Sequence, residues 1–469
     1  MSGIDGKGMI GASDMFIYPK EEELDSESLK AFIDYNESLS ANYRKQLGMY
    51  RGVYDIEKED KKPLNKPDNR IAINYAKYLV NVFNGFFAGI APQISLKDNK
   101  QNDQLQTFNT LNSVPDKISD IAKACSLYGR AYMFLFMDEQ ARLRVTISLP
   151  ANSFIIYDDT VAHDPLYFVR YSKDKDDNLS GQVYSATEVK GFDDDFKYID
   201  QEANVLKAVP AIEFMENDER LPLYDKSTVS IMNAINKAMS QKANDSDAIA
   251  DAYLFFKGGE LDKEVLENMA DKRVIAVSTG DSDAKFLERP SGDGTQEHLL
   301  DRLVRNLFQT TMVTNLDDVN ATGSDQSGYS IELKMQGMRS LAAVKERKFI
   351  ISLRQMYQIV FSVEGIKKGL LGKVKDKMIG TASDPVNNLV FNFTRNLPKN
   401  VQLEATVAKT LEGIVSKQTQ LKAIPSLVDD PQAEIDAMRE EEKDTVTNAV
   451  ETNPANYQFK EVESDERKE

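Results

Sequence analysis

Residues 295–365 constrain the fold more than any other stretch, because they combine a helix, a polar loop and a second, much longer helix. Apolar residues recur at three- and four-residue spacing from 299 to 311, which predicts an amphipathic helix with Asp293 as its cap. Residues 315–328 are mostly polar and turn-forming, so they predict a loop. Helical periodicity then returns, and a helix over residues 329–365 would be roughly 50 Å long at ~1.5 Å per residue. A helix of that length is too long to be buried in one small core. Together with a polar loop at one end, it indicates an assembly in which the loop faces an open space.

The charge balance argues against tight, general binding of nucleic acid. The chain has 469 residues, enough for two or more domains, and a net charge of −17. Because affinity for phosphate comes largely from Lys and Arg, we do not expect the chain to hold nucleic acid tightly across its whole surface, but its acidity does not exclude DNA that slides past without binding tightly. The single cysteine, Cys125, excludes an intrachain disulfide and suits a reducing cytoplasm. We expect no signal peptide and no membrane span, since the most apolar window, residues 75–94, is interrupted by Lys77 and Pro92.

The first half of the chain predicts an α+β domain with an antiparallel sheet. Residues 1–25 are rich in glycine and then in acidic residues, which predicts a flexible N-terminus. Helices are expected at residues 21–54 and 105–128, the second closed by Gly129. Residues 69–83 predict a short extended entry and then a buried helix that ends near Gly85 or Gly89. Residues 138–140 predict a hairpin turn. The predicted strands are residues 132–136, 142–147, 154–157, 166–171 and 182–185.

The second half predicts two helices that bracket a small module. Ser227 starts a helix to about residue 257, and its small, polar middle, residues 240–247, suits either a close helix neighbour or a wetted surface. The module itself predicts a helix at 261–269 and strands at 273–277 and 285–287. After the long helix, a strand at 389–393 is expected to rejoin the first sheet. The remaining predictions are helices at 403–415, 419–427 and 434–444, the last opened by Asp430-Pro431, and a disordered tail from 445.

No enzyme signature is found. The two histidines, His163 and His298, cannot form a His-rich metal site, and we expect both to be ordinary solvated or hydrogen-bonded residues. Cys125 lies in an apolar helix without a suggested histidine partner, so it is expected in the core.

Two further patterns resemble binding motifs only superficially. Residues 365–374 fail as a P-loop, because the glycine spacing is wrong and Val374 replaces the Ser or Thr that would bind magnesium. The acidic runs at Asp158-Asp159 and at residues 193–195 are interpreted as solvated turns in preference to ligands for two metals. No metal and no cofactor is therefore expected.

The order of these parts resembles that of the portal proteins of tailed bacteriophages, especially the group found in siphophages of Gram-positive hosts. The resemblance covers residues 26–443 and depends mainly on the order in which the parts occur. The stretches that are similar to this family are residues 69–85, residues 211–217 with the helix after Ser227, residues 324–334, and residues 412–419 followed by 428–431. The resemblance implies a portal-like α+β fold and a structural protein that is not an enzyme.

The resemblance assigns each part of the chain to a region of a portal. Residues 1–25 remain a flexible N-terminus and 445–469 a disordered tail. The implied regions are a wing at 26–226 completed by 366–400, stem helices at 227–257 and 295–314, a clip at 258–294, a tunnel loop at 315–328, a long wing helix at 329–365 and a helical crown at 401–444.

The same resemblance implies two sets of site residues. The tunnel loop is expected to face DNA through Asn315, Asp317, Asp318, Asn320, Ser324, Asp325 and Gln326. The clip is expected to dock the packaging motor and the adaptor through Glu260, Asp271, Lys272, Arg273, Asp281, Asp283 and Lys285.

Members of this family form a dodecameric ring at one capsid vertex, so the resemblance also implies partners. These are further copies of the chain, double-stranded DNA in the channel, the terminase large subunit, a head–tail adaptor, and the major capsid and scaffolding proteins. The implied location is the virion, and the host cytoplasm during assembly. Two alternatives remain open. Metal-dependent cleavage would favour a nucleic-acid enzyme of α+β fold, and a monomer or dimer in solution would favour a non-enzymatic helical adaptor protein.

Overall fold

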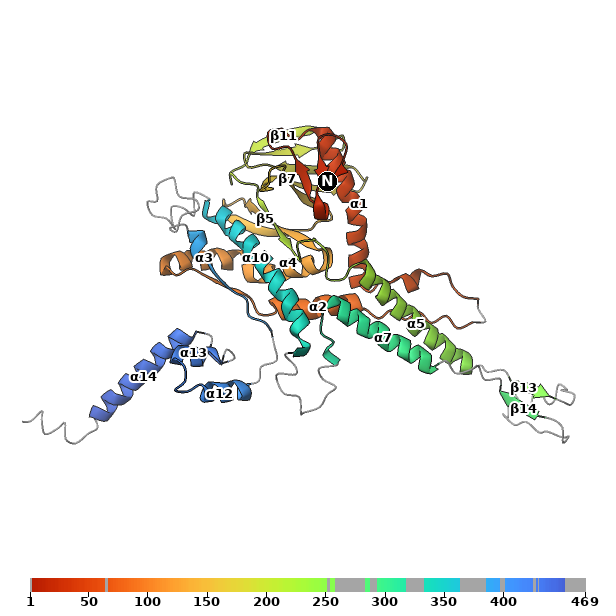
Figure 1. Ribbon diagram of the computed structural model, residues 1–469. Coiled ribbons are helices and arrows are strands. Elements are labelled where there is room, and N and C mark those ends of the chain that lie inside the picture. The colour runs from red at the N-terminus through yellow and green to blue at the C-terminus, as the bar shows by residue number, and fades with distance from the viewer. Residues whose placement is uncertain are drawn as a thin grey trace, which may run out of the picture. The chain divides into compact units, whose positions relative to one another are not determined.

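The computed structural model describes residues 2–63, 66–250, 254–257, 283–286, 293–317, 333–362, 385–396, 401–424, 427–428 and 430–451. The chain divides into two compact units (Figure 1), one formed by Met1–Asn320 with Lys334–Asn396 and the other by Ala321–Leu333 with Leu397–Glu469. The first unit contains both sheets and helices, and the described part of the second is helical. This confirms the predicted α+β class.

An eight-stranded sheet is the largest element of the first unit, in the order β1-β2-β3-β7-β8-β9-β10-β11. Its neighbouring strands are antiparallel except β3 and β7, which pair in parallel with Ile17 opposite Tyr157. The strands are β1 (Ser2–Gly3), β2 (Met9–Ile10), β3 (Phe16–Tyr18), β7 (Ser153–Asp158), β8 (Pro165–Lys173), β9 (Leu179–Tyr184), β10 (Glu188–Phe192) and β11 (Tyr198–Ala203), with the short helix η1 (Ala12–Asp14) before β3.

The flexible N-terminus predicted for residues 1–25 is wrong, because β1, β2 and β3 belong to this sheet. Phe16, Ile17 and Tyr18 are buried, and the ring of Phe16 stacks on Phe154 of β7 with centroids 4.4 Å apart. Each of these strands is only two or three residues long, and β7 is distant in the chain. A periodicity signal cannot develop over so few residues, so the glycine-rich composition dominates the prediction.

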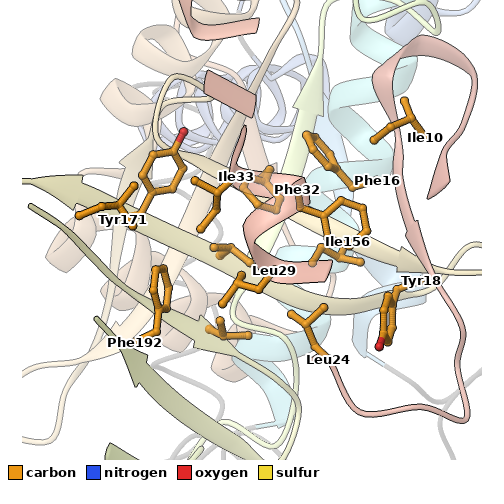
Figure 2. Close-up of a cluster of buried hydrophobic side chains, with 14 residues drawn as sticks. Ile10, Phe16, Tyr18, Leu24, Leu29, Phe32, Ile33, Ile156, Tyr171 and Phe192 are labelled. Carbon is orange, nitrogen blue, oxygen red and sulfur yellow. The ribbon is translucent and has the colours of Figure 1, made fainter. Parts of the chain in front are cut away.

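One face of the large sheet packs against α1 (Ser26–Tyr50). Asp25 caps this helix by accepting the N–H of Ser28 at 2.7 Å. Figure 2 shows the resulting core, in which Leu29 and Phe32 of α1 meet side chains from the strands. The buried members of this cluster are Ile10, Phe16, Tyr18, Leu24, Leu29, Phe32, Ile33, Phe154, Ile156, Val169, Tyr171, Leu179, Val183 and Phe192.

A second, three-stranded antiparallel sheet has the order β12-β5-β6. It consists of β5 (Arg130–Met137), β6 (Leu143–Ser148) and β12 (Ala211–Met215). The predicted hairpin joins β5 and β6, where Asp138 Oδ1 accepts the N–H groups of Gln140 and Arg142. The buried helix predicted to end near Gly85 or Gly89 is α2 (Tyr75–Ala88), which Asn74 caps and which ends at Gly89.

Two helices, α3 (Asn99–Asn112) and α4 (Val114–Tyr128), replace the single helix predicted at residues 105–128. Ser113 between them has a left-handed φ of 49°, and Pro115 follows in the first turn of α4. Proline lacks an N–H and its ring clashes with the preceding helical turn, so a continuous helix breaks here. The predicted closure by Gly129 is confirmed: its φ is +85°, and a Cβ there would lie 1.9 Å from the carbonyl oxygen of Arg220.

The helices α5 (Lys226–Ala250) and α7 (Asp293–Thr311) lie side by side (Figure 1). Between them in the chain, β13 (Leu254–Lys257) pairs antiparallel with β14 (Asp283–Phe286). The predicted extension of the first helix to residue 257 is therefore wrong, because the Leu-Phe-Phe-Lys run favours a strand. Asp293, predicted to cap this helix from the position before it, is the first residue of α7. The elements predicted at 261–269 and 273–277 lie outside the described residues.

The long helix is α10 (Gln336–Ser362), whose 27 residues span about 40 Å at ~1.5 Å per residue. The later strand, β15 (Val390–Asn392), follows η3 (Pro385–Asn388) and pairs with β4 (Gln93–Ser95) in a separate two-stranded sheet. The prediction that it rejoins the first sheet is wrong. Arg354 of α10 holds this segment in place by donating to the carbonyl oxygen of Val386 at 2.9 Å and by lying over the ring of Phe391.

The described part of the second unit contains α12 (Val401–Thr410), α13 (Lys417–Lys422) and α14 (Pro431–Glu451). Asp430 opens α14 as predicted, since its Oδ1 accepts the N–H groups of Gln432 and Ala433. The tail predicted to be disordered from residue 445 begins inside α14, which continues to Glu451. Residues 452–469 lie outside the described residues.

Candidate functional site

The structure describes two of the residues predicted to face DNA, Asn315 and Asp317. Asn315 Oδ1 accepts the N–H of Asp317 at 3.1 Å, and the Asp317 side chain is exposed to solvent. Leu316 and Asp317 are helical, so the predicted loop begins with a helical turn. The other predicted tunnel residues, Asp318, Asn320, Ser324, Asp325 and Gln326, lie outside the described residues.

The chain turns sharply where it leaves α7. Met312 has a φ of 56°, in the left-handed region that a methionine rarely adopts. Thr314 is buried, and its Oγ1 donates to the carbonyl oxygen of Lys334 at 3.3 Å. A Cβ added at Gly337 would lie 3.2 Å from the carbonyl oxygen of Met312, so α10 approaches this turn closely. These contacts join the residues before the predicted loop to the residues after it.

Two tyrosines of α2, about one helical turn apart, hold the end of α7. The rings of Tyr75 and Tyr78 meet the ring of Phe308 edge-on, with centroids 6.1 Å and 5.7 Å away. The hydroxyl of Tyr78 also accepts the N–H of Leu316 at 2.9 Å. Burial raises the pKa of Tyr75, and the negative charge of Asp317 adds to this rise. The start of the predicted tunnel loop is therefore attached to a largely buried helix.

The polar middle of α5 binds an extended segment of the chain. Asn236, Ser240 and Asn244 accept backbone N–H groups from residues 73, 71 and 69, at 2.9, 2.8 and 2.6 Å respectively. These three acceptors are four residues apart on α5, which corresponds to a rise of about 6 Å, and two residues of extended chain span about 6.6 Å. Every second N–H of the extended segment therefore meets the next acceptor on the helix. The sequence left open a close helix neighbour or a wetted surface for this stretch. The segment that these three side chains contact is extended and not helical, while α7 packs against the same helix.

Polar side chains also join α5 to α7. Lys242 forms an ion pair with Glu297, and Gln296 Nε2 donates to Asp245 Oδ2 at 3.1 Å. Beyond the ends of these helices, β14 carries two of the predicted clip residues, Asp283 opposite Lys257 and Lys285 opposite Phe255. The other predicted clip residues lie outside the described residues: Glu260, Asp271, Lys272, Arg273 and Asp281.

A buried lysine fixes α10 to the sheet domain. The Lys345 ammonium lies 2.5 Å from Glu216 Oε2 and donates to the carbonyl oxygen of Ala122 and to Ser126 Oγ, both at 2.8 Å. It is also surrounded by three aromatic rings, whose centroids lie 5.1–5.6 Å away: Phe83, Phe87 and Phe349. Seven residues further along α10, Ser352 Oγ donates to the carbonyl oxygen of Glu213. The position of α10 is therefore set by polar contacts within the core.

A second buried charge centre surrounds Glu213. Arg220 donates to both of its carboxylate oxygens, at 2.9 and 2.8 Å, and the Tyr157 hydroxyl donates to it at 2.7 Å. Burial raises the pKa of the Glu213 carboxyl, but Arg220, Arg130 and Tyr157 together lower it below its ordinary value. Burial and the charge of Glu213 raise the pKa of Tyr157 well above its ordinary value, so the phenol stays a donor. Arg130 also donates to the carbonyl oxygen of Asp14, which ties the N-terminal strands to this centre.

The residues considered for metal or catalytic chemistry are structural where they are described. Asp158 is the last residue of β7 and is fully buried, so the solvated turn predicted for it is wrong. It accepts hydrogen bonds from Thr160 and Asp164 and pairs with Lys20 at 3.3 Å, and His163 Nδ1 lies 3.0 Å from its carbonyl oxygen. Asp193, in contrast, closes its own turn.

Cys125 is buried, and burial raises the pKa of its thiol, as expected for a core cysteine. His298 is exposed on α7. Within the described residues, no group of three or more His, Cys, Asp or Glu side chains is placed to hold a metal ion. In the same part of the chain, no helix is both long and apolar enough to cross a bilayer. Residues 365–374 lie outside the described residues.

The sequence reasoning missed Tyr78 and both buried charge centres. The signal for Lys345 was present, because this lysine lies on the apolar stripe of α10 between Ala342 and Phe349. A charged residue in such a stripe predicts a buried partner. No comparable signal exists for Tyr78, since its partner is a backbone N–H distant in the chain.

Comparisons with known proteins identify the family of this chain. A family model described as “Phage portal protein, SPP1 Gp6-like” matches residues 29–448. The portal protein of Bacillus phage SPP1 is 23% identical over 419 residues, which cover 83% of this chain and 80% of that protein. The portal protein of Clostridium phage phiCD119 is 20% identical over 431 residues, which cover 85% of this chain and 90% of that protein.

Among solved structures, a chain titled “Neck of empty GTA particle computed with C6 symmetry” is 11% identical, with a TM-score of 0.42 over 74% of this chain and 89% of that chain. The family match extends from α1 into α14. The chain therefore belongs to the phage portal protein family, in its SPP1 Gp6-like group.

Proposed function

We propose that twelve copies of this chain form a closed ring at one vertex of a phage capsid, and that double-stranded DNA is packaged and ejected through the channel at its centre. The observation that carries this proposal is the family match over residues 29–448, which spans nearly every described element. Portal proteins are structural components of the virion, so the ring conducts DNA and performs no catalysis of its own.

The parts of the chain take distinct places in this ring. The α+β domain of residues 26–226, completed by 366–400, is the wing, and α10 is the long wing helix. The adjacent helices α5 and α7 are the stem. Strand β14 lies in the clip at residues 258–294, and its partner β13 (Leu254–Lys257) directly precedes the clip. Residues 315–328 are the tunnel loop, and α12 to α14 form the crown. The side-by-side contact of α5 and α7, with a strand pair between them in the chain, supports the stem and clip assignments.

Electrostatics support passage of DNA in preference to capture. Each subunit carries a net charge of −17, and a channel lined by acidic side chains repels phosphate. DNA then finds no deep bound minimum along its path. Asp317, exposed at the start of the tunnel loop, is one such side chain and would recur in every subunit.

The assembly implies further partners. The clip docks the terminase large subunit during packaging and a head–tail adaptor afterwards, while the wing contacts the major capsid and scaffolding proteins. The protein is located in the virion, and in the host cytoplasm during assembly.

Negative-stain imaging and native mass spectrometry of the purified chain test the proposal. We expect rings with a central hole and a mass near twelve subunits. A strictly monomeric or dimeric protein at micromolar concentration would contradict it. Magnesium-dependent cleavage of DNA by a monomer would replace it with the enzyme alternative.

A further inference from the structure

A backbone turn and two contacts close the base of the tunnel loop. The chain reverses at Met312, Thr314 Oγ1 donates to the carbonyl oxygen of Lys334, and Gly337 leaves room for the Met312 carbonyl against α10. Residues 312–314 are thus joined to residues 334–337.

A third contact connects this base to a different element. Leu316 is the first residue of the helical turn at 316–317, and the first N–H groups of a helix lack acceptors within the helix. The hydroxyl oxygen of Tyr78 supplies the acceptor at 2.9 Å. Tyr78 belongs to α2, where Leu79, Val80 and Phe83 are fully buried. The amide that immediately precedes Asp317 is therefore tied to a helix that cannot easily move.

Tyr75 is a natural control for this contact. Its ring meets the same Phe308, edge-on and at a similar distance, from the preceding turn of α2. Within the described residues its hydroxyl makes no hydrogen bond, whereas the Tyr78 hydroxyl binds Leu316. The two tyrosines thus share a packing role and differ in the contact to the loop.

We propose that Tyr78 is a positioning residue for the tunnel loop: its hydroxyl fixes the point at which the chain leaves the stem and the direction in which Asp317 enters the channel. The inference rests on the proposed portal function. It adds a specific residue, outside both stem and loop, that controls how the loop is presented to DNA.

The test compares Tyr78→Phe with Tyr75→Phe in the full-length assembled chain. Each variant loses one hydroxyl and keeps the ring against Phe308, so we expect both to form rings with nearly unchanged thermal unfolding. Hydrogen–deuterium exchange with mass spectrometry is measured on overlapping peptides that contain Leu316. Loss of one neutral hydrogen bond predicts about fivefold faster exchange of this amide in Tyr78→Phe and no change in Tyr75→Phe. In a packaging assay, Tyr78→Phe is expected to package several-fold less DNA per head than Tyr75→Phe.

The outcomes separate this inference from the proposed function. Equal exchange of Leu316 in both variants would overturn the role of the hydroxyl. Faster exchange in Tyr78→Phe with equal packaging by the two variants would overturn the positioning role, and would leave the channel function intact because the wild type still packages. If heads that lack the wild-type chain package DNA normally, the proposed function fails and the positioning role fails with it.

Discussion

The ammonium group of Lys345 lies 2.5 Å from a carboxylate oxygen of Glu216, and both side chains are buried. This pair connects the middle of α10 to the end of β12. Lys334, two residues before the start of α10, accepts a hydrogen bond from Thr314 at the base of the tunnel loop. By fixing α10, the buried pair therefore sets where this base lies relative to the sheet domain.

The Lys345→Met variant removes one member of this buried pair and keeps the side-chain stem within the aromatic cage. An uncompensated buried carboxylate costs about 3–5 kcal/mol of unfolding free energy. Adding Glu216→Gln is expected to restore part of that loss, because neither charge is then left alone. Urea unfolding followed by circular dichroism, at matched protein concentration, measures both variants.

Lys348→Met is the matched control, since Lys348 lies one turn further along α10 and pairs with Asp218, which is largely exposed. A surface pair contributes roughly 0–1 kcal/mol. If Lys345→Met and Lys348→Met lose the same free energy, the buried pair does not anchor α10.

A second prediction concerns the N-terminal strands. Phe16 is 1% exposed and contacts the rings of Phe154, Phe32 and Tyr35. Phe16→Ala should cost about 3–5 kcal/mol, as expected for a large cavity in a packed core. Val161→Ala, at a fully exposed position, should cost almost nothing. An unchanged unfolding midpoint for Phe16→Ala would mean that residues 1–25 are flexible after all.

The sequence predicted elements well wherever a long enough pattern existed. The strands from residue 132 to 185, α2 with its closing Gly89, and the start of α14 at Pro431 follow from periodicity and capping rules. Prediction failed where one residue or a distant partner decided the outcome. Pro115 divides α3 from α4, and the parallel pairing of β3 with β7 is a tertiary contact that no local pattern records.

The candidate site was predictable in outline only. Composition located the polar stretch that begins at Asn315, and the structure places this residue at the start of a helical turn. Its attachment points were not predictable, because Tyr78 reaches a backbone N–H that is 238 residues away. In the same way, the small polar residues of α5 suited a close helix neighbour or a wetted surface, and did not indicate the extended segment at 69–73 that they contact. The spacing of the acceptors on Asn236, Ser240 and Asn244 matches the spacing of every second N–H in an extended chain, and that match depends on three-dimensional geometry.

A third prediction follows from that polar row. Ser240→Ala removes the acceptor for the N–H of Ile71, which is partly buried and then loses its partner. The expected cost is about 1–3 kcal/mol, that of leaving a donor unsatisfied. Ser246→Ala, on an exposed position of the same helix, is the control and should be within about 0.5 kcal/mol of wild type. Faster exchange of the amides at 69–73 in Ser240→Ala alone would confirm the cause, and equal exchange in both variants would contradict it.

A fourth prediction concerns pH. The pKa of Glu213 is lowered in the folded protein from an ordinary value of 4.5, so its ionised form is stabilised by folding. This contribution is fully present above the unfolded pKa and is lost as the pH falls through the lowered folded value. Glu213→Gln should therefore be less stable than wild type at pH 7, by about 3 kcal/mol, and the difference should shrink below pH ~4.5. Thermal unfolding from pH 7 to 3 measures it. Glu139→Gln, an exposed control, should show a constant small difference, and a constant difference for Glu213→Gln would rule out the assigned linkage.

The last prediction concerns charge at the start of the tunnel loop. Replacing both Asp317 and Asp318 with Lys reverses two charges per subunit, repeated around the ring. Each lysine can then capture a phosphate and release a counterion, which gives DNA a bound minimum where it should slide. Assembly should be unaffected, because Asp317 is exposed and contributes little to packing. Packaging is expected to stall or to remain incomplete, and higher salt should relieve part of the defect by weakening phosphate binding.

The control for this variant is Asp176→Lys with Asp177→Lys, two exposed neighbouring acids in the turn between β8 and β9. It changes the net charge of each subunit by the same amount at a position assigned to the wing. Packaged DNA length and packaging rate are measured for both double variants beside wild type. A defect confined to the variant at 317 and 318 supports a DNA-facing loop. Equal defects would point to net charge as the cause, and normal packaging by the variant at 317 and 318 would remove these two residues from the channel wall.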